Sequence, residues 1–290
     1  MGTSGWDYPS WRETFYPPSL PRSEELRYLA ARLSSVEVDC TFYGSQRPAT
    51  FARWYESTPA DFVFALKGPR TISHHGPPER LHGSIAHFFS QGLLCLREKL
   101  GPILWQFPAH EEMSLPHLEA ILAQLPRTHA EAHALSDAHA LSCAPVPLTS
   151  SQRPIRYAVE VRSPSVKCAE TRRLCKAAGV ALVFNDAAAP WPRFSSVTTD
   201  FMYARLHGSA ALYASRYEDE ELEGWAERVH RWRLQKCSLE EKHPLEVYLY
   251  FNNDAHGHAP HDALRLSDKI AERSCCSPRV DRTGRRRLFE

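Results

Sequence analysis

Carboxylates, cationic groups and a histidine stand at alternate positions in several short segments of the 290-residue chain. The alternating pairs are Glu37 and Asp39, Glu160 and Arg162, and Arg205 and His207. Side chains two positions apart in a β-strand point to the same face, so each pair is expected to share a face. The residues at the intervening positions, which point to the opposite face, are apolar, as at Val159 and Val161. These patterns predict strands that carry polar groups on one face and pack under helices with the other.

Paired carboxylates of this kind could perform acid–base catalysis. We expect Glu160 and Glu37 to act as acid and base, because surroundings can drive the pKa values of two carboxylates on different strands apart. We expect His207 to shuttle protons, because the ordinary pKa of histidine lies near neutral pH. These three residues are the predicted catalytic groups.

Further polar and aromatic residues near the ends of the same segments are expected to bind a substrate. Arginine suits this role because its guanidinium group can bind an anion through two parallel hydrogen bonds. The predicted substrate-binding residues are Trp6, Asp39, Tyr43, Lys67, His74, Gln106, Arg162, Asp186, Arg205 and Asn252. The full set predicts an enzyme of the hydrolase or lyase type that acts on a small polar or anionic substrate.

The same residues leave a metal-dependent alternative open. The ligand types of a divalent ion are present in Glu37, Glu160, Asp186 and His207. Phosphoester cleavage, including that of nucleic acid, would follow from such a site. However, the sequence has no H-E-x-x-H motif, and nearby lysine and arginine side chains would compete for the carboxylates. We therefore predict no bound metal and keep a phosphoesterase or nuclease-like barrel as the alternative.

Two other interpretations use the same residues without catalysis. The predicted pocket could capture a metabolite without transforming it. The charged groups could also form a structural lattice of ion pairs, because three acidic and three basic residues nearly cancel. These are Glu37, Asp39 and Glu160 against Lys67, Arg162 and Arg205. Apolar residues would serve stability at least as well as buried ion pairs, so a ring of charges at one end favours a ligand.

Strand and helix patterns alternate along the chain, which indicates a parallel sheet with right-handed crossovers. The predicted strands are Thr3–Trp6, Val36–Phe42, Phe62–Lys67, Ile103–Phe107, Tyr157–Val161, Ala181–Asn185, Phe201–Leu206 and Val247–Phe251. The predicted helices are Ser23–Leu33, His82–Leu100, Leu115–Leu125, Cys168–Ala178, Asp219–Leu234 and Ala259–Ile270. Eight strands are the number that closes a TIM (β/α)8 barrel, whose active site lies at the carboxyl ends of the strands.

The predicted barrel is a single domain over residues 1–272. An extended excursion at about 128–154 interrupts it, and residues 273–290 are expected to form a basic, disordered tail. Lys and Arg number 35 against 34 Asp and Glu, so the charge balance gives no support for a broad nucleic-acid surface. Nucleic acid is therefore an unlikely partner.

Composition also bears on location and cofactors. The chain has no apolar run of about 18 residues and no signal-peptide pattern, so we expect a cytoplasmic protein without a membrane span. The eight cysteines form no C-x-x-C pair and are expected to be reduced. The absence of G-x-G-x-x-G and G-x-x-x-x-G-K motifs predicts no nucleotide cofactor. The oligomeric state is left open.

Several short motifs resemble those of one family. They are Gly2–Trp6, Phe15–Pro17, Val36–Tyr43, Phe62–Lys67, Gly101–Pro108, Ala158–Arg162, Arg205–Gly208 and Tyr250–Asp254 with Gly257. In this order they resemble the YecE-like family, a barrel family of unknown function. The resemblance runs to about residue 266. It implies a TIM barrel but no established reaction.

Overall fold

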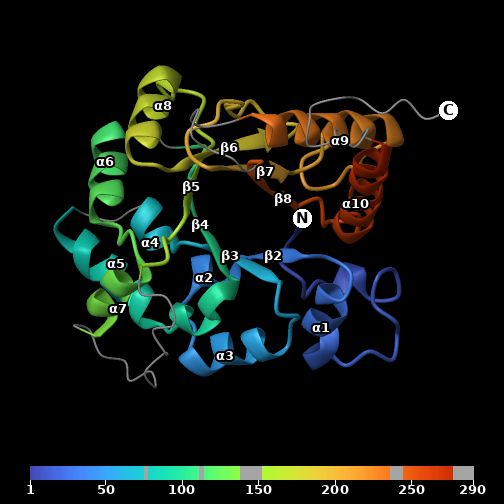
Figure 1. Cartoon of the computed structure of the whole chain (residues 1–290), viewed down its shortest axis with the longest axis horizontal. Coiled ribbons are helices and arrows are strands. Elements are labelled where there is room, and N and C mark those ends of the chain that lie inside the picture. Colours follow the sequence, from blue (N-terminus) through green and yellow to red (C-terminus); the bar gives the residue numbers. More distant parts are fainter. Residues whose placement is uncertain (75–77, 111–113, 138–151, 236–243, 277–290) are drawn as a thin grey trace, which may run out of the picture.

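The computed structural model describes residues 1–74, 78–110, 114–137, 152–235 and 244–276. Within these ranges eight parallel strands form a closed barrel, in which each strand pairs with the next and β1 pairs with β8 (Figure 1). The strands are β1 Gly2–Ser4, β2 Ser35–Val38, β3 Val63–Lys67, β4 Leu100–Phe107, β5 Tyr157–Val161, β6 Ala181–Asp186, β7 Phe201–Leu206 and β8 Glu246–Phe251. The predicted (β/α)8 barrel is confirmed.

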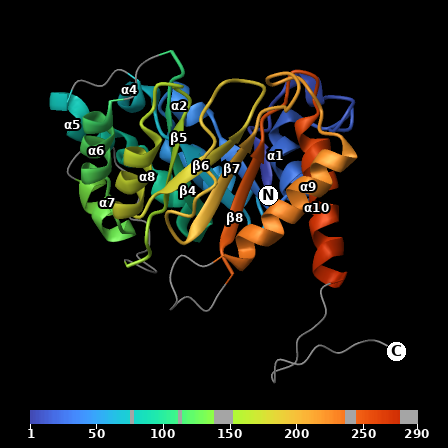
Figure 2. The same ribbon diagram turned by 90° about the horizontal axis from the view of Figure 1, so that it is seen from above.

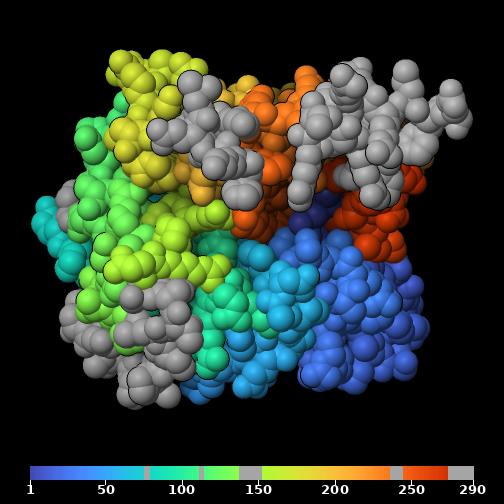
Figure 3. Space-filling model, in the orientation of Figure 1, coloured from blue at the N-terminus to red at the C-terminus, as the bar shows by residue number. Residues whose placement is uncertain are grey.

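Helices surround the strands in chain order. They are α1 Glu25–Ala30, α2 Cys40–Tyr43, α3 Pro48–Glu56, α4 Arg70–Ser73, α5 Leu81–Ser90, α6 Leu115–Gln124, α7 His129–Asp137, α8 Cys168–Ala177, α9 Asp219–Leu234 and α10 Ala259–Cys276. Figure 2 shows the barrel from the side, with the helices flanking the strands. In the space-filling view the colours run around the molecule, so that the last helix meets the first segments (Figure 3).

The outward strand residues form the main core with the helices. Val36, Val159 and Leu206 are fully buried there, as the apolar parity predicts. The large helix residues Trp225 and Trp232 of α9 pack on Phe184 of β6 with ring centroids 5.5 and 5.6 Å apart. Burial of such aromatic side chains stabilises the helix layer on the barrel.

The interior of the barrel has two layers. The apolar layer consists of Ala65, Leu104, Ala158, Ala181, Val183, Phe201, Tyr203 and Tyr250. Two positions further along the same strands stand Lys67, Gln106, Glu160, Asn185, Arg205 and Asn252. Because alternate residues share a face, these side chains form a polar layer at the carboxyl ends of the strands.

Strand β2 is shorter than predicted. It ends at Val38, and Cys40–Tyr43 forms the short helix α2 instead of continuing the strand to Phe42. The Thr41 hydroxyl consequently donates to the backbone oxygen of Lys67 at 2.7 Å and does not continue the inward parity of Glu37. The chain turns there because Gly44 and its neighbours must lead back into α3.

The predicted helix 82–100 is divided into two parts. Helix α5 ends at Ser90, a 3-10 segment covers Leu93–Lys99, and β4 already begins at Leu100. Gly92 separates the parts with a φ of 93°, a conformation that favours glycine, and a Cβ there would lie 2.7 Å from Pro48. The sequence pattern also failed to predict α3, which packs on the 3-10 segment and, through Trp54, on Phe64 of β3.

The excursion and the tail differ in part from prediction. Helix α7 occupies the beginning of the 128–154 excursion, and residues 138–151 lie outside the described residues. Helix α10 extends to Cys276, past the predicted helix end at Ile270 and past residue 272, the predicted end of the domain. Arg273 in this extension donates to Glu223 of α9 at 2.7 Å. The rest of the predicted tail, residues 277–290, lies outside the described residues.

None of the described helices is long and apolar enough to cross a membrane. Four cysteines of the described residues form no disulfide bond. They are Cys40, Cys95, Cys168 and Cys175.

Candidate functional site

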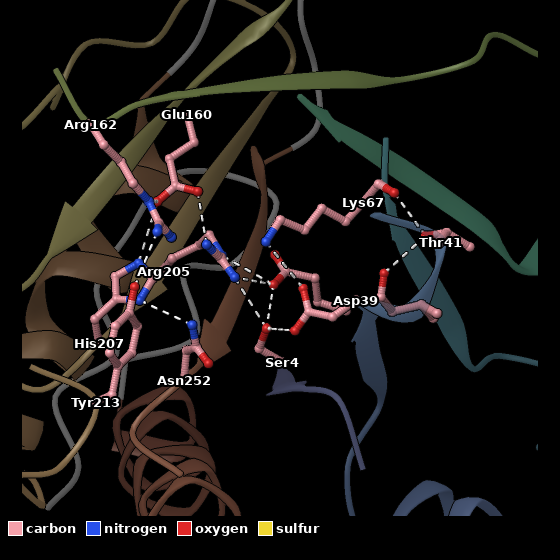
Figure 4. A network of polar contacts seen from close by, with 12 residues as sticks. Ser4, Asp39, Thr41, Lys67, Glu160, Arg162, Arg205, His207, Tyr213 and Asn252 are labelled. Carbon is pink, nitrogen blue, oxygen red and sulfur yellow. Dashed lines mark hydrogen bonds and ion pairs between the residues drawn. The ribbon is translucent and has the colours of Figure 1, made fainter. Parts of the chain in front are cut away.

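Arg205 of β7 is the centre of a buried ion-pair network inside the barrel (Figure 4). Its Nη2 lies 2.6 Å from Oε1 of Glu37, and its Nη1 lies 2.8 Å from Oε2 of Glu160. Burial alone would lower the pKa of Arg205, but Glu160 and Glu37 hold it well above its ordinary value. The guanidinium group is therefore permanently charged and joins β2, β5 and β7.

The carboxylate of Glu37 has no oxygen left for a substrate. Oε1 accepts from Arg205 and, at 2.6 Å, from the hydroxyl of Ser4, while Oε2 accepts from the hydroxyl of Tyr203 at 2.6 Å. The side chain is fully buried. This geometry suits a residue that orients Arg205 rather than one that exchanges protons with a ligand. We call Ser4, Glu37, Glu160, Tyr203 and Arg205 the Arg205 network.

Glu160 connects this network to Arg162, which lies nearer the surface. The Nε of Arg162 donates to Oε1 of Glu160 at 2.9 Å. Burial would raise the pKa of Glu160, but Arg162 and Arg205 together hold it well below its ordinary value. Glu160 is thus a fixed carboxylate at neutral pH, which does not fit the predicted role of an acid. The role of either glutamate in catalysis stays a prediction.

His207 follows β7 and is completely buried beside Glu160. The Asn252 amide donates to its Nδ1 at 3.2 Å, so the proton of the ring sits on Nε2, which lies 3.4 Å from Oε1 of Glu160. Burial lowers the pKa of His207 to about 3 despite this carboxylate. The ring is therefore neutral at pH 7, and its geometry favours a positioning role over the predicted proton shuttle.

The upper edge of the polar layer is partly exposed. Lys67 Nζ lies 3.5 Å from Oδ1 of Asp39, whose side chain is 22% exposed, and Oδ1 accepts no hydrogen bond. The other oxygen of Asp39 lies 2.7 Å from the hydroxyl of Ser4, whose one proton is shared between this oxygen and Oε1 of Glu37. Burial lowers the pKa of Lys67, while Asp39 opposes this shift. We call Asp39, Lys67, Arg162, Tyr213 and Asn252 the barrel mouth.

Tyr213 belongs to this site although the sequence did not indicate it. Its hydroxyl accepts from Nη1 of Arg162 at 3.1 Å, and its ring packs 5.5 Å from that of His207. Its φ is 62°, a left-handed conformation that is unfavourable for a bulky residue. Strain of this kind is found where surrounding contacts enforce a geometry. Trp191 adds its ring, whose centroid lies 4.2 Å from the guanidinium carbon of Arg162.

Asp254 is a second residue that sequence analysis left without a role in the site. Its Oδ1 accepts from the indole of Trp11 at 3.1 Å, whereas its buried Oδ2 has no hydrogen-bond partner. Burial raises the pKa of Asp254 well above its ordinary value, and Asp39 adds to this shift. Asp254 therefore lies at the same end of the barrel in surroundings that favour the uncharged form of its carboxyl group. Only its place after Asn252 could have signalled it.

Four predicted binding residues lie away from the network contacts. Tyr43 is 68% exposed on α2. His74 packs its ring 5.3 Å from that of Phe42, which in turn faces Lys67. Trp6 packs edge-on against Trp54 at 5.4 Å. Gln106 is buried in the polar layer, paired in register with Glu160.

Asp186 is a correction to the predicted site. It lies on the outer face of β6, where Oδ2 accepts from the indole of Trp225 at 3.2 Å and Oδ1 lies 3.7 Å from Arg193. The alternation of the strand turns Asn185 inward instead. The proposed metal ligands Glu37, Glu160, Asp186 and His207 are consequently not brought together. The described residues contain no group of three or more His, Cys, Asp or Glu that could hold a metal ion.

The fold and the polar layer define a TIM-barrel protein with a charged, partly exposed mouth at the carboxyl ends of its strands. The chain belongs to the family described as "Protein of unknown function DUF72", whose model matches residues 1–283. This confirms the family resemblance of the motifs.

Two named relatives match part of the chain. UPF0759 protein YecE of Escherichia coli (strain K12) is 29% identical over 127 residues, which cover 43% of this chain and 44% of YecE. UPF0759 protein YunF of Bacillus subtilis (strain 168) is 26% identical over 113 residues, covering 37% of this chain and 39% of YunF. The aligned segments thus span less than half of these relatives.

Solved structures agree with the fold. A DUF72 family protein of Thermotoga maritima MSB8 has a TM-score of 0.69 and 24% identity, covering 93% of this chain and 98% of that chain. A DUF72 family protein of Enterococcus faecalis V583 has the same TM-score of 0.69 at 20% identity, with coverage of 93% and 94%. At these identities the likeness concerns the fold alone.

Proposed function

We propose that this protein is an enzyme of the hydrolase or lyase type that acts on a small anionic substrate at the barrel mouth. The observation that carries the proposal is the arrangement of Lys67, Arg162 and Asp39 above the closed Arg205 network (Figure 4). The side chains of Lys67, Arg162 and Asp39 are 7%, 12% and 22% exposed at this end of the barrel, and the buried Oδ1 of Asp39 has no hydrogen-bond partner. Active sites of TIM barrels lie at this end.

The residues divide into two groups by their place in the polar layer. Lys67 and Arg162 bind the anionic group of the substrate, with Arg162 held flat by Glu160 and by the ring of Trp191. Asp39 acts as the acid–base group, because its Oδ1 makes no hydrogen bond and has only the ion pair with Lys67, 3.5 Å away. Glu37, Glu160 and His207 orient the cations from below, which revises the roles expected from sequence while keeping the same residues.

Two other functions compete with this proposal. A non-catalytic metabolite binder would use the same Lys67 and Arg162 without needing Asp39. A metal-dependent phosphoesterase would need Asp186 beside Glu37, Glu160 and His207. Asp186 instead lies on the outer face of the barrel, and the guanidinium group of Arg205 binds both glutamates. The geometry therefore favours anion binding with acid–base chemistry.

Anion binding is tested by thermal unfolding with inorganic phosphate or chloride at equal ionic strength. Phosphate is expected to raise the unfolding midpoint of the wild type, because a ligand that binds only the folded state stabilises it. Arg162→Gln should show a smaller increase. Arg172→Gln, on the exposed face of α8, is the matched control and should retain it. An equal increase in all three proteins would contradict binding at the mouth.

Catalysis is tested with a panel of nitrophenyl esters, glycosides and phosphates. Asp39→Asn is expected to reduce any turnover by about 10²- to 10⁴-fold, the usual contribution of a general acid or base. Asp61→Asn, an exposed carboxylate before β3, serves as the control. Phosphate binding without turnover of any panel member would favour the metabolite binder.

A further inference from the structure

A separate cavity of about 430 Å³ lies beside the barrel mouth, between α2, α4 and the start of α5. Helices α2 and α4 follow β2 and β3 directly, and both lie at the upper edge of Figure 2. The side chains that matter for its chemistry are Tyr43, Arg70, Glu79, Arg80 and His87. None of them takes part in the Arg205 network.

The cavity carries an excess of positive charge. Arg70 and Arg80 line it, and neither forms an ion pair with any described residue, while Glu79 is the one acidic side chain in the described lining. Guanidinium groups without a carboxylate partner are free to bind an anion through two hydrogen bonds. His87 adds a ring whose Nε2 lies 3.1 Å from the hydroxyl of Ser45.

One wall of the cavity is fixed and the rim is aromatic. The buried Gln91 side chain accepts from the backbone nitrogen of Gln46 at 2.9 Å, which holds the segment after α2 in place. Tyr43 stands at the rim, 68% exposed, with its ring 5.0 Å from Phe42. An exposed aromatic side chain over a charged pocket offers a surface on which a flat ring can stack.

We infer that this cavity is a second binding site, for an organic phosphate whose phosphate group contacts Arg70 and Arg80 and whose ring stacks on Tyr43. The site goes beyond the proposed function of the mouth. Phe42 separates the two, since its ring lines the cavity on one side and lies 4.0 Å from Nζ of Lys67 on the other. A ligand can therefore occupy the cavity without touching Asp39 or Arg162.

Gly83 provides a sharp steric test. It lines the cavity from α5, and a Cβ built there would meet no atom within 4 Å. The Cβ of a larger side chain therefore fits at this position, and a phenylalanine there is expected to occupy space in the cavity. Replacing a helix glycine does not weaken the helix. Gly224 of α9 is a matched control, because a Cβ there also meets nothing within 4 Å.

The experiment is isothermal titration of phenyl phosphate into Arg162→Gln protein, which removes the anion site of the mouth. Saturable binding in the millimolar range or tighter is expected. Adding Gly83→Phe should abolish it, and adding Arg70→Gln with Arg80→Gln should weaken it about tenfold or more. Adding Gly224→Phe, or Arg172→Gln with Arg173→Gln, should leave it unchanged. Circular dichroism confirms that each variant is folded.

The outcomes separate the two sites. Loss of binding in Arg162→Gln alone, or binding that survives Gly83→Phe, overturns the inference, since the probe would then bind at the mouth or elsewhere. Equal binding of phenol and phenyl phosphate also overturns it, because the arginines would then play no part. A failure of Asp39→Asn to affect turnover would concern the proposed function alone.

Discussion

Glu160 shows how a single residue can support both stability and a site. Its two oxygens accept from Arg205 and Arg162, and the ring of His207 lies against it. Arg205 is 1% exposed, so its charge depends on carboxylates for compensation. Replacing such a partner leaves an uncompensated buried charge, which costs far more than the pair contributes. Glu160 therefore stabilises the barrel and orients Arg162 at once.

Glu160→Gln is expected to lower the free energy of unfolding by about 3 kcal/mol, because Arg205 keeps only Glu37 as a charged partner. It should also reduce phosphate binding, since Arg162 loses the carboxylate that orients it. Urea denaturation measures the first effect and thermal shift with phosphate the second. Glu246→Gln, an exposed carboxylate on Arg156 at the other end of the barrel, is the control, with a change below about 1 kcal/mol. A destabilised Glu160→Gln protein that binds phosphate normally would mark the network as purely structural.

At the scale of elements, alternation along strands predicted the site where the strands were placed correctly. Glu160, Arg162 and Arg205 follow the parity of β5 and β7, and the structure brings them together. At the end of β6 the same alternation turns Asn185 inward. The predicted binding residue Asp186 therefore points outward. Strand ends are set by contacts between elements, which local patterns do not contain.

The site residues that the sequence pattern did not predict lie in loops. Tyr213 and Trp191 lie in segments without periodicity, so no spacing relates them to Arg162. Tyr43 was assigned to the mouth because the predicted strand ran to Phe42; the helical turn of α2 places it over the neighbouring cavity instead. The closed barrel and its polar layer were predictable, whereas the loop contribution depends on tertiary contacts.

The β3–β4 pair is packed closely enough to be sensitive to a small substitution. The register shifts between Phe64 and Leu66, and a Cβ at Gly101 would lie 2.4 Å from Cγ1 of Val63. Gly101→Ala should therefore lower the free energy of unfolding by about 1–3 kcal/mol through overpacking. Gly224→Ala in α9, where a Cβ meets nothing, should raise it by about 0.5–1 kcal/mol. Urea denaturation of both variants checks the contrast; equal effects would argue against close packing at Gly101.

At the scale of the whole molecule, the polar layer makes stability depend on pH. Strands β2, β5 and β7 are joined through ionised groups, and neutral His207 lies in the same buried space. A buried histidine must be protonated when the chain unfolds in acid, and a buried carboxylate held in its charged form must also take up a proton. Both changes favour the unfolded chain at low pH, but they begin at different pH values.

The order of these two changes predicts the shape of acid unfolding. The pKa of His207 is lowered to about 3 in the folded protein from an ordinary 6.5, so its contribution to stability is complete above pH 6.5 and declines as the pH falls below that value. The expected slope is about 1.4 kcal/mol per pH unit. Glu160, whose folded pKa lies well below 4.5, adds its own decline only below its ordinary value.

His207→Gln should therefore flatten the dependence of unfolding free energy on pH between 6.5 and 5 while leaving the steeper decline below the ordinary pKa of Glu160. His129 also has a pKa lowered by burial and by Arg153, so His129→Gln should flatten the same range, and the double variant should be flatter than either. Urea denaturation at a series of pH values gives the slopes directly. An unchanged slope in His207→Gln would mean that the ring is protonated in the folded barrel and paired with Glu160, which would restore it as a candidate proton carrier at the mouth.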